Sequence, residues 1–145
     1  MTRRELLRIL DANFNRSREG LRVCEEITRF VMNDKALTRE IKKARHAVTH
    51  CLKKFPVPVS ALVAARESMA DVGKKSSRLE KGRQNAQGLF LANSERSKEA
   101  LRALEETSKF LDIKASERFK KIRFRVYSIE KKVLQKLETV RHHRS

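Results

Sequence analysis

The sequence predicts an all-α protein, in which two copies of a helical hairpin form a four-helix bundle with a short linking helix and loop. Three observations support this fold class. Hydrophobic residues make up 39% of the chain and charged residues 37%, with only two Pro and four Gly, a composition that suits helices. No segment alternates apolar and polar residues between turn dipeptides, as strands do. A stretch of nineteen residues also recurs eighty residues later.

The first helix is expected to begin at a capping box, because Thr2 is a good N-cap and Glu5 follows it three residues later. We expect this helix to extend to about Met32, where Asn33-Asp34 ends it. At roughly 100° per residue, its apolar residues share one broad face, which we expect to be buried. These residues are Leu6, Ile9, Leu10, Phe14, Leu21, Cys24, Ile27, Phe30 and Val31.

The second helix is expected from Thr38, another N-cap candidate, to Lys54. The two helices form the first hairpin, within residues 2–54. Two prolines then stop helix formation, and residues 55–78 link the two copies. This linking segment is expected to contain a short helix from Ser60 to Ala70, followed by a loop.

The second hairpin is expected within residues 79–140. Its first helix covers roughly Leu79 to Leu111, although two glycines weaken the start of that helix. The last helix is expected from Ser116 to Val140, and residues 141–145 form a basic tail. Helical hairpins related by a pseudo-twofold axis pack naturally as a four-helix bundle. We therefore interpret residues 1–145 as a single domain.

The repeat retains polar residues. Residues 12–30 read ANFNRSREGLRVCEEITRF and residues 92–110 read ANSERSKEALRALEETSKF, with ten of the nineteen positions identical. Seven of those ten are polar or charged. Residues 42–48 similarly match residues 120–126, in the second helix of each hairpin. A helix kept only for its fold needs its apolar stripe alone, so the shared polar residues indicate a site that is built twice.

Both copies place polar residues within the apolar face. The first has Asn13, Arg16, Ser17 and Gly20 there, and the second has Asn93, Arg96, Ser97 and Ala100. A buried Arg or Asn costs free energy unless every donor is satisfied. Two interpretations are therefore open: an internal Arg–Glu–Asn network that fixes helix register, or a ligand site in which arginine binds phosphate bidentately. Glu19 and Glu99, one turn from the arginines, are expected to orient the guanidinium groups.

The formal net charge of +17 requires an anionic partner or a tolerance for one. Nucleic-acid modules usually cluster their cations and interleave aromatic residues, whereas this chain spreads its cations and has no Trp. The charge suits small phosphorylated ligands about as well as RNA. No apolar run reaches membrane-spanning length and no signal peptide is recognisable, so we expect a soluble, cytoplasmic protein. Cys24 and Cys51 are expected to be reduced core residues.

Other candidate motifs are weaker. Residues 73–76 read GKKS, like the end of a P-loop, but Ser68 stands where that motif needs its first glycine and no strand precedes it. This loop is either a phosphate-binding nest or an ordinary solvated loop. Asp71 is either a magnesium ligand or a helix cap. His46 and His50 share a helix face without an acidic pair, so a metal site is not predicted there.

The string LDANFNRSREGLRV, residues 10–23, resembles the opening of one family, the small non-ribokinase type of hydroxymethylpyrimidine phosphate kinase. Members stand alone or form an N-terminal domain fused to thiamine-phosphate synthase. Asp71-Val72-Gly73, Arg45-His46 and residues 92–106 also resemble blocks of this family. The likeness covers roughly residues 3–132 and resembles the standalone form.

The resemblance implies an ATP-dependent enzyme that requires Mg²⁺ and phosphorylates hydroxymethylpyrimidine monophosphate to the diphosphate in thiamine synthesis. It also implies selectivity for the phosphorylated substrate over the free alcohol. The expected partners are that phosphorylated pyrimidine, ATP and, functionally, thiamine-phosphate synthase. No membrane partner is expected. A nucleic acid is not expected either, although the net charge of +17 leaves it open, and homodimerisation is also left open. Phosphoryl transfer depends mainly on alignment and charge neutralisation, which a duplicated Asn-Arg motif suits.

We assign the site residues accordingly. The predicted catalytic residues are Arg16, Arg96, Asp71, Glu19 and Glu99, with Asp71 also as the metal ligand. The predicted substrate-binding and phosphate-binding residues are Asn13, Asn93, Arg22, Arg45, His46, Arg102, Arg123 and Gly73. Gly20 is expected to permit close approach of the pyrimidine. Lys74 departs from the small hydroxyl residue expected after Gly73. The alternatives are a basic helical RNA- or protein-binding module with a structural Arg–Glu network, and an all-α mutase that needs no ATP.

Overall fold

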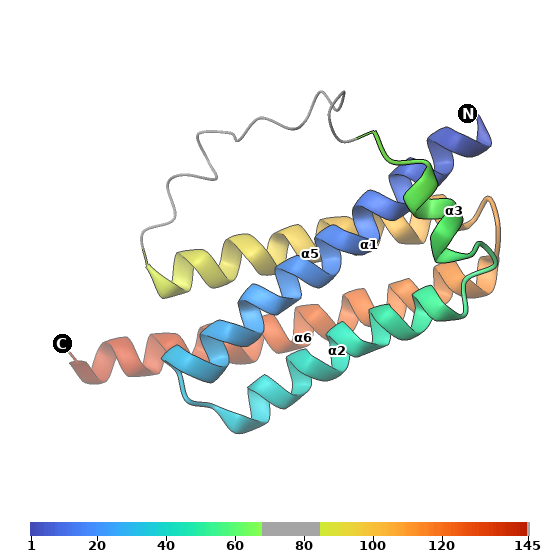
Figure 1. Ribbon diagram of the computed structural model, residues 1–145. Coiled ribbons are helices and arrows are strands. Elements are labelled where there is room, and N and C mark those ends of the chain that lie inside the picture. Colours follow the sequence, from blue (N-terminus) through green and yellow to red (C-terminus); the bar gives the residue numbers. More distant parts are fainter. Residues whose placement is uncertain (68–84, 145) are drawn as a thin grey trace.

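The computed structural model describes residues 1–67 and 85–144, and every regular element within these ranges is a helix. The elements are α1 (Arg3–Glu26), the π-helical turn η1 (Ile27–Val31), α2 (Lys35–Lys53), α3 (Val59–Ala64), α5 (Ala86–Ser108) and α6 (Ile113–Arg144). Helix α1 packs against α2 and α5, and α6 packs against the same two helices (Figure 1). Neighbouring long helices run antiparallel. The prediction of an all-α bundle built from two hairpins is confirmed.

Helix α1 begins as predicted and ends differently. The Thr2 hydroxyl accepts a hydrogen bond from the Glu5 backbone N–H at 3.1 Å, and the Glu5 carboxylate accepts one from the Thr2 N–H at 2.9 Å. At the other end, Phe30 and Val31 were expected to be buried but are 62% and 56% exposed. They lie in the π-helical turn, whose i→i+5 hydrogen bonds rotate each residue by less than the 100° of an α-helix. The residues therefore leave the buried face.

Helix α2 begins before its expected start. Asp34 is the N-cap, because its carboxylate accepts a hydrogen bond from the Leu37 N–H at 2.9 Å. Thr38, the predicted cap, lies inside the first turn, and its hydroxyl donates to the Asp34 carbonyl at 2.7 Å. Asn33 has a φ of 52°, a left-handed conformation that Asn tolerates better than most residues. Asn33-Asp34 thus ends one helix and caps the next.

The remaining bounds also differ from those expected. Helix α3 ends at Ala64, and the residues predicted to extend it from 68 to 70 lie outside the described ranges, as does the predicted loop. Helix α5 has Asn85 as its N-cap, with the carboxamide oxygen accepting from the Gly88 N–H at 2.7 Å. Helix α6 runs to Arg144 and so includes most of the predicted tail. No helix in the parts that the structure describes is long and apolar enough to cross a membrane.

The two copies share their buried positions as well as their sequence. Asn13 and Asn93, eighty residues apart, are both buried, and each donates to the carbonyl four residues earlier in its own helix, at 2.8 and 2.9 Å. In the second helix of each hairpin, Val48 and its counterpart Val126 are both buried. The pseudo-twofold relation therefore includes side-chain hydrogen bonds and burial.

Gly20 lies where α1 meets α5. A Cβ atom there would be 2.3 Å from Ser97 Oγ and 2.7 Å from the Asn93 carbonyl oxygen. The expectation that this glycine makes room for a pyrimidine is wrong, because the backbone of α5 occupies that space. The core beside it is aromatic: the Phe14 ring contacts Phe55 and Phe119 edge-on, each at a centroid distance of 5.5 Å.

Candidate functional site

Two adjoining pockets lie along the outer side of α1. The first, here the Arg16 pocket, has a volume of about 750 Å³ and is lined by Glu5, Arg8, Ile9, Asp11, Ala12, Asn13, Asn15, Arg16, Arg66 and Glu67. The second, here the Arg45 pocket, has a volume of about 480 Å³ and is lined by Asn15, Arg18, Glu19, Arg22, Arg45 and Thr49. Asn15 belongs to both. The two hollows therefore adjoin at this residue.

The Arg16 pocket combines one internal ion pair with two cations that form none. Arg66 binds Asp11 bidentately, with Nε and Nη2 at 2.7 and 2.9 Å from the two carboxylate oxygens. Arg8 and Arg16 form no ion pair with any described residue. The Asn13 amide nitrogen donates to the Ile9 carbonyl, and no described residue donates to its amide oxygen. The pocket therefore presents two unpaired arginines and one amide acceptor, beside the carboxylates of Glu5 and Glu67, which bind the Thr2 N–H and Arg4.

The expected orientation of Arg16 and Arg96 needs correction. Arg16 is exposed and Arg96 is half-buried, although both were expected within the apolar face. A long arginine side chain at the margin of that face can keep its stem on apolar surface while its charged end reaches water. Glu19 and Glu99 are also exposed, and within residues 1–67 and 85–144 neither pairs with an arginine. The expected orienting role of these two glutamates is therefore wrong.

A buried carboxylate that the sequence interpretation missed organises the Arg45 pocket. Glu25 is 3% exposed and accepts hydrogen bonds from Arg22 Nη1 at 2.7 Å and from Arg45 Nη2 at 3.3 Å. Arg18 instead donates to neutral oxygens, the Asn15 side chain at 3.0 Å and the Phe14 carbonyl at 3.3 Å. Arg22 and Arg45, both predicted to bind phosphate, are thus held by a glutamate on the same side of the bundle.

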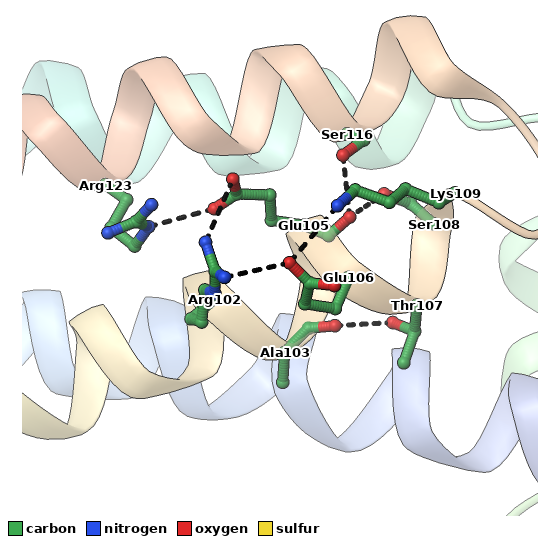
Figure 2. Close-up of polar contacts among 9 residues, drawn as sticks. All are labelled: Arg102, Ala103, Glu105, Glu106, Thr107, Ser108, Lys109, Ser116 and Arg123. Carbon is green, nitrogen blue, oxygen red and sulfur yellow. Dashed lines mark hydrogen bonds and ion pairs between the residues drawn. The ribbon is translucent and has the colours of Figure 1, made fainter.

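The second copy repeats this arrangement (Figure 2). Glu105 is 5% exposed and accepts from Arg123 Nε at 2.9 Å and from Arg102 Nη1 at 3.4 Å. The hydrogen bond from Arg123 raises the pKa of that guanidinium. The backbone carbonyl of Glu105 also accepts from the hydroxyls of Ser108 and Ser116, at 3.3 and 2.7 Å. Each copy therefore contains an Arg–Glu network, but its residues are not Asn13, Arg16 and Glu19 or their counterparts, for which an Arg–Glu–Asn network was left open above.

The structure gathers the predicted residues of the first copy and separates them from those of the second. Five of the first set line the two α1 pockets: Asn13, Arg16, Glu19, Arg22 and Arg45. His46 is exposed on α2 and lines neither pocket. The predicted residues Asn93, Arg96, Glu99, Arg102 and Arg123 lie on α5 and α6 and line neither pocket. Gly73 and Asp71, the predicted magnesium ligand, lie outside the described residues.

The described residues provide no ready-made metal site, because they contain no group of three or more His, Cys, Asp or Glu side chains that could hold an ion. The pocket residues that were missed are mostly polar neighbours on α1. At 100° per residue, Arg8, Asn15 and Arg18 fall on the same side of the helix as Arg22, so the helical period could have identified them. Arg66 had no such signal, because its partner Asp11 is far away in the sequence.

Comparison with known proteins identifies relatives over most of the chain. A model of the ThiD2 family matches residues 8–132. The chain is 39% identical over 130 residues to a thiamine-phosphate synthase of Synechocystis sp., which covers 89% of this chain and 36% of the relative. It is 42% identical over 126 residues to a thiamine-phosphate synthase of Nostoc sp., covering 85% of this chain and 34% of the relative. The chain thus spans about a third of the length of these relatives. No solved structure matches it.

Proposed function

Because the chain belongs to the ThiD2 family, we propose that it phosphorylates 4-amino-5-hydroxymethyl-2-methylpyrimidine monophosphate to the diphosphate, with ATP as donor. The matched relatives bear the name thiamine-phosphate synthase, which supports a role in thiamine biosynthesis. The proposal includes a functional link between this kinase and thiamine-phosphate synthase.

One observation carries the proposal: two pockets with available cations adjoin at Asn15. A kinase must hold two phosphorylated substrates so that donor and acceptor oxygens approach in line. It must also neutralise the charge that both substrates bring. Arg8 and Arg16 in one pocket and Arg18 in the other have no carboxylate partner among the described residues. These arginines therefore supply the required charge at two neighbouring positions.

We assign the pyrimidine monophosphate to the Arg16 pocket. Arg8 and Arg16 would bind its phosphate, and the Asn13 amide oxygen would accept a hydrogen bond from the ring amino group. Binding the unphosphorylated alcohol would leave both guanidinium groups without an anion. A site built for a charged or hydrogen-bonding group discriminates strongly against an analogue that lacks the group. The pocket thus accounts for selectivity toward the monophosphate.

We assign the phosphate chain of ATP to the Arg45 pocket, beside the acceptor. Magnesium typically uses one or two carboxylates together with substrate phosphates and retained waters, so its binding here would depend mainly on the nucleotide. Asp71 remains the proposed carboxylate, although it lies outside the described residues. When bound, the ion would neutralise phosphate charge. The arginines of the two pockets would orient the donor and acceptor.

The test is a coupled assay of ADP release. The proposal requires release with the pyrimidine monophosphate and little or none with the free alcohol. Arg16→Ala should abolish most of this activity, whereas Arg125→Ala, which removes an exposed arginine on α6 outside both pockets, should retain it. Absence of monophosphate-dependent ADP release from folded protein would contradict the proposal. Salt-sensitive RNA binding by the same inactive protein would favour the basic binding module instead.

A further inference from the structure

The Arg45 pocket has a counterpart in the second copy, and the two sites have diverged. In α5 the counterparts lie eighty residues later in the sequence, and in α6 they lie seventy-eight later. The lining residues of the Arg45 pocket, taken in sequence order, correspond in the second copy to Glu95, Lys98, Glu99, Arg102, Arg123 and Tyr127. Three cations occur in both sites. The residues that surround those cations differ.

In the second-copy site, the first of these cations is neutralised and covered. Lys98 is 6% exposed and forms ion pairs with Glu95 and, at 2.9 Å, with Glu130. Burial lowers the pKa of Lys98, but the hydrogen bonds with these two carboxylates outweigh it and raise that pKa overall. The ammonium also lies 4.4 Å from the centre of the Tyr127 ring, a favourable cation–π contact. Lys98 has no free side on which an anion could bind.

In the first copy, the corresponding cation is not neutralised. Asn15 stands where the second copy has Glu95, and Leu52 stands where it has Glu130. Arg18 accordingly donates only to the neutral oxygens of Asn15 and Phe14. Replacing two carboxylates by an amide and a hydrocarbon leaves the positive charge of Arg18 available to a ligand.

The second shared cation shows the same difference. Arg123 Nε donates to Glu105 at 2.9 Å. In the first copy, Arg45 reaches Glu25 only through Nη2, at 3.3 and 3.5 Å. Arg45 Nε is a buried side-chain nitrogen without a hydrogen-bond partner, and in the described parts of the chain no other buried side-chain nitrogen or oxygen lacks one. The carboxylate thus satisfies the Arg45 guanidinium less completely than that of Arg123, and Arg45 lines the Arg45 pocket.

The size of one side chain completes the contrast. The Tyr127 ring lies over Lys98 and has its centre 6.0 Å from Arg123 Cζ. Thr49, its counterpart, is much smaller and leaves the hollow of about 480 Å³ open between Arg18 and Arg45. The first copy is therefore open and positive where the second is covered and neutralised.

We propose that the Arg45 pocket is the anion-binding site for a phosphate chain, contacted by Arg18 and Arg45, and that its second-copy counterpart binds no anion. Of the two copies, only the first has such a site, although the repeat had indicated a site that is built twice. The proposal rests on the proposed function only in identifying the bound phosphate chain as that of the donor nucleotide.

The test measures the binding of inorganic pyrophosphate by isothermal titration calorimetry. The chain used carries Arg8→Ala/Arg16→Ala throughout, which removes the two unpaired cations of the Arg16 pocket, so that the titration reports the Arg45 pocket and its second-copy counterpart. We expect one pyrophosphate per chain. The double variant Asn15→Glu/Thr49→Tyr introduces the second-copy residues at two half-exposed positions of the Arg45 pocket. It should weaken pyrophosphate binding by about tenfold or more. Ser128→Glu adds the same negative charge at an exposed position of α6 and serves as the matched control.

The converse variant, Glu95→Asn/Tyr127→Thr/Glu130→Leu, should create a second binding site per chain. Two sites in the Arg8→Ala/Arg16→Ala protein would overturn the proposal. Equal weakening by the double variant and by Ser128→Glu would also overturn it, since the binding would then report only net charge. Circular dichroism shows whether each variant is folded, and the double variant decides the matter if the triple variant does not fold. Site-specific pyrophosphate binding without ADP release would sustain this site while refuting the kinase.

Discussion

The hydroxyl of Ser97 donates a hydrogen bond to the backbone carbonyl of Ser17, at 3.2 Å, and these two serines occupy the same position in the two copies. The pseudo-twofold axis therefore passes close to this contact. Both serines are fully buried, and Ser97 Oγ also lies 2.9 Å from the Asn93 carbonyl oxygen within its own helix. The duplicated residues thus stabilise the contact between α1 and α5, where the two copies meet, and are not reserved for a ligand.

Replacing Gly20 by alanine should destabilise the contact between α1 and α5. The new Cβ would lie 2.3 Å from Ser97 Oγ and 2.7 Å from the Asn93 carbonyl oxygen, and the backbone carbonyl cannot rotate away. Overpacking of this kind typically costs about 1–3 kcal/mol, which exceeds the gain of up to about 1 kcal/mol in helix propensity. Urea unfolding of Gly20→Ala should show this loss in the free energy of unfolding.

Gly88→Ala is the matched control. Its Cβ would meet only the Asn85 side chain, with the nearest atom at 3.1 Å, and that side chain can shift. The control should therefore leave stability unchanged or raise it slightly. If both alanine variants were equally stable, the close approach of α1 and α5 at Gly20 would not restrict the fold.

The buried glutamates should contribute unequally to stability. Glu105→Gln removes the charge that faces Arg123, which is only 13% exposed, and breaking such a pair costs about 3 kcal/mol or more. Glu25→Gln should cost less, roughly 1–3 kcal/mol, because Arg45 is held at a longer distance. Denaturant unfolding of the two single variants measures the difference. Equal losses would indicate that the two copies hold their arginines alike.

Arg16 and Arg96 should differ in their effects on catalysis. Arg16→Ala should lower kcat/KM for the pyrimidine monophosphate by about 10²–10³, in the range found for lost electrostatic contacts in a transition state. Its free energy of unfolding should change little, since the side chain is exposed. Arg96→Ala removes a half-buried residue that lines neither α1 pocket and should change kcat/KM much less. Identical kinetic losses in the two variants would instead indicate one composite pocket shared by both copies.

The sequence predicted those features that depend on near neighbours in the chain. The capping box at Thr2 follows from local hydrogen bonding. Most of the buried stripe of α1 follows from the helical period, although Ile9, expected in that stripe, is 37% exposed. Glu25 escaped notice because a glutamate on a helix usually faces water, and one of the two arginines that make its burial favourable, Arg45, is twenty residues away. The π-helical turn carries no recognisable sequence signal. It arises where the chain must leave α1 and reach the cap at Asp34.

The candidate site was predicted in part, for a related reason. The repeat identified which polar residues matter, but self-similarity cannot show that the two copies have different surroundings. The residues that make the difference, Asn15 opposite Glu95 and Thr49 opposite Tyr127, are those at which the copies disagree. An interpretation based on the identical positions alone therefore predicted two equivalent sites.

The thiol of Cys24 provides a prediction about pH. Burial, reinforced by the charge of Glu130, raises the pKa of Cys24 to about 12, whereas in the unfolded chain the thiol ionises near its ordinary value of 9.0. Below that value both states hold the proton, and the contribution of Cys24 to stability is fully present. As the pH rises from 9.0 toward 12, only the unfolded chain releases its proton, so the contribution falls by up to about 1.4 kcal/mol per pH unit.

Cys24→Ala tests this linkage. The variant should be less stable at neutral pH, because it leaves a cavity in the core, but the difference in free energy of unfolding between it and the unmodified protein should shrink as the pH rises above 9.0. Comparing the two proteins at each pH cancels the contributions of the ionisable groups that both proteins share. Urea unfolding across this range measures the difference. A difference that stayed constant would mean that Cys24 ionises in the folded protein as readily as in the unfolded chain, and hence that its environment is far more polar than the contacts around it indicate.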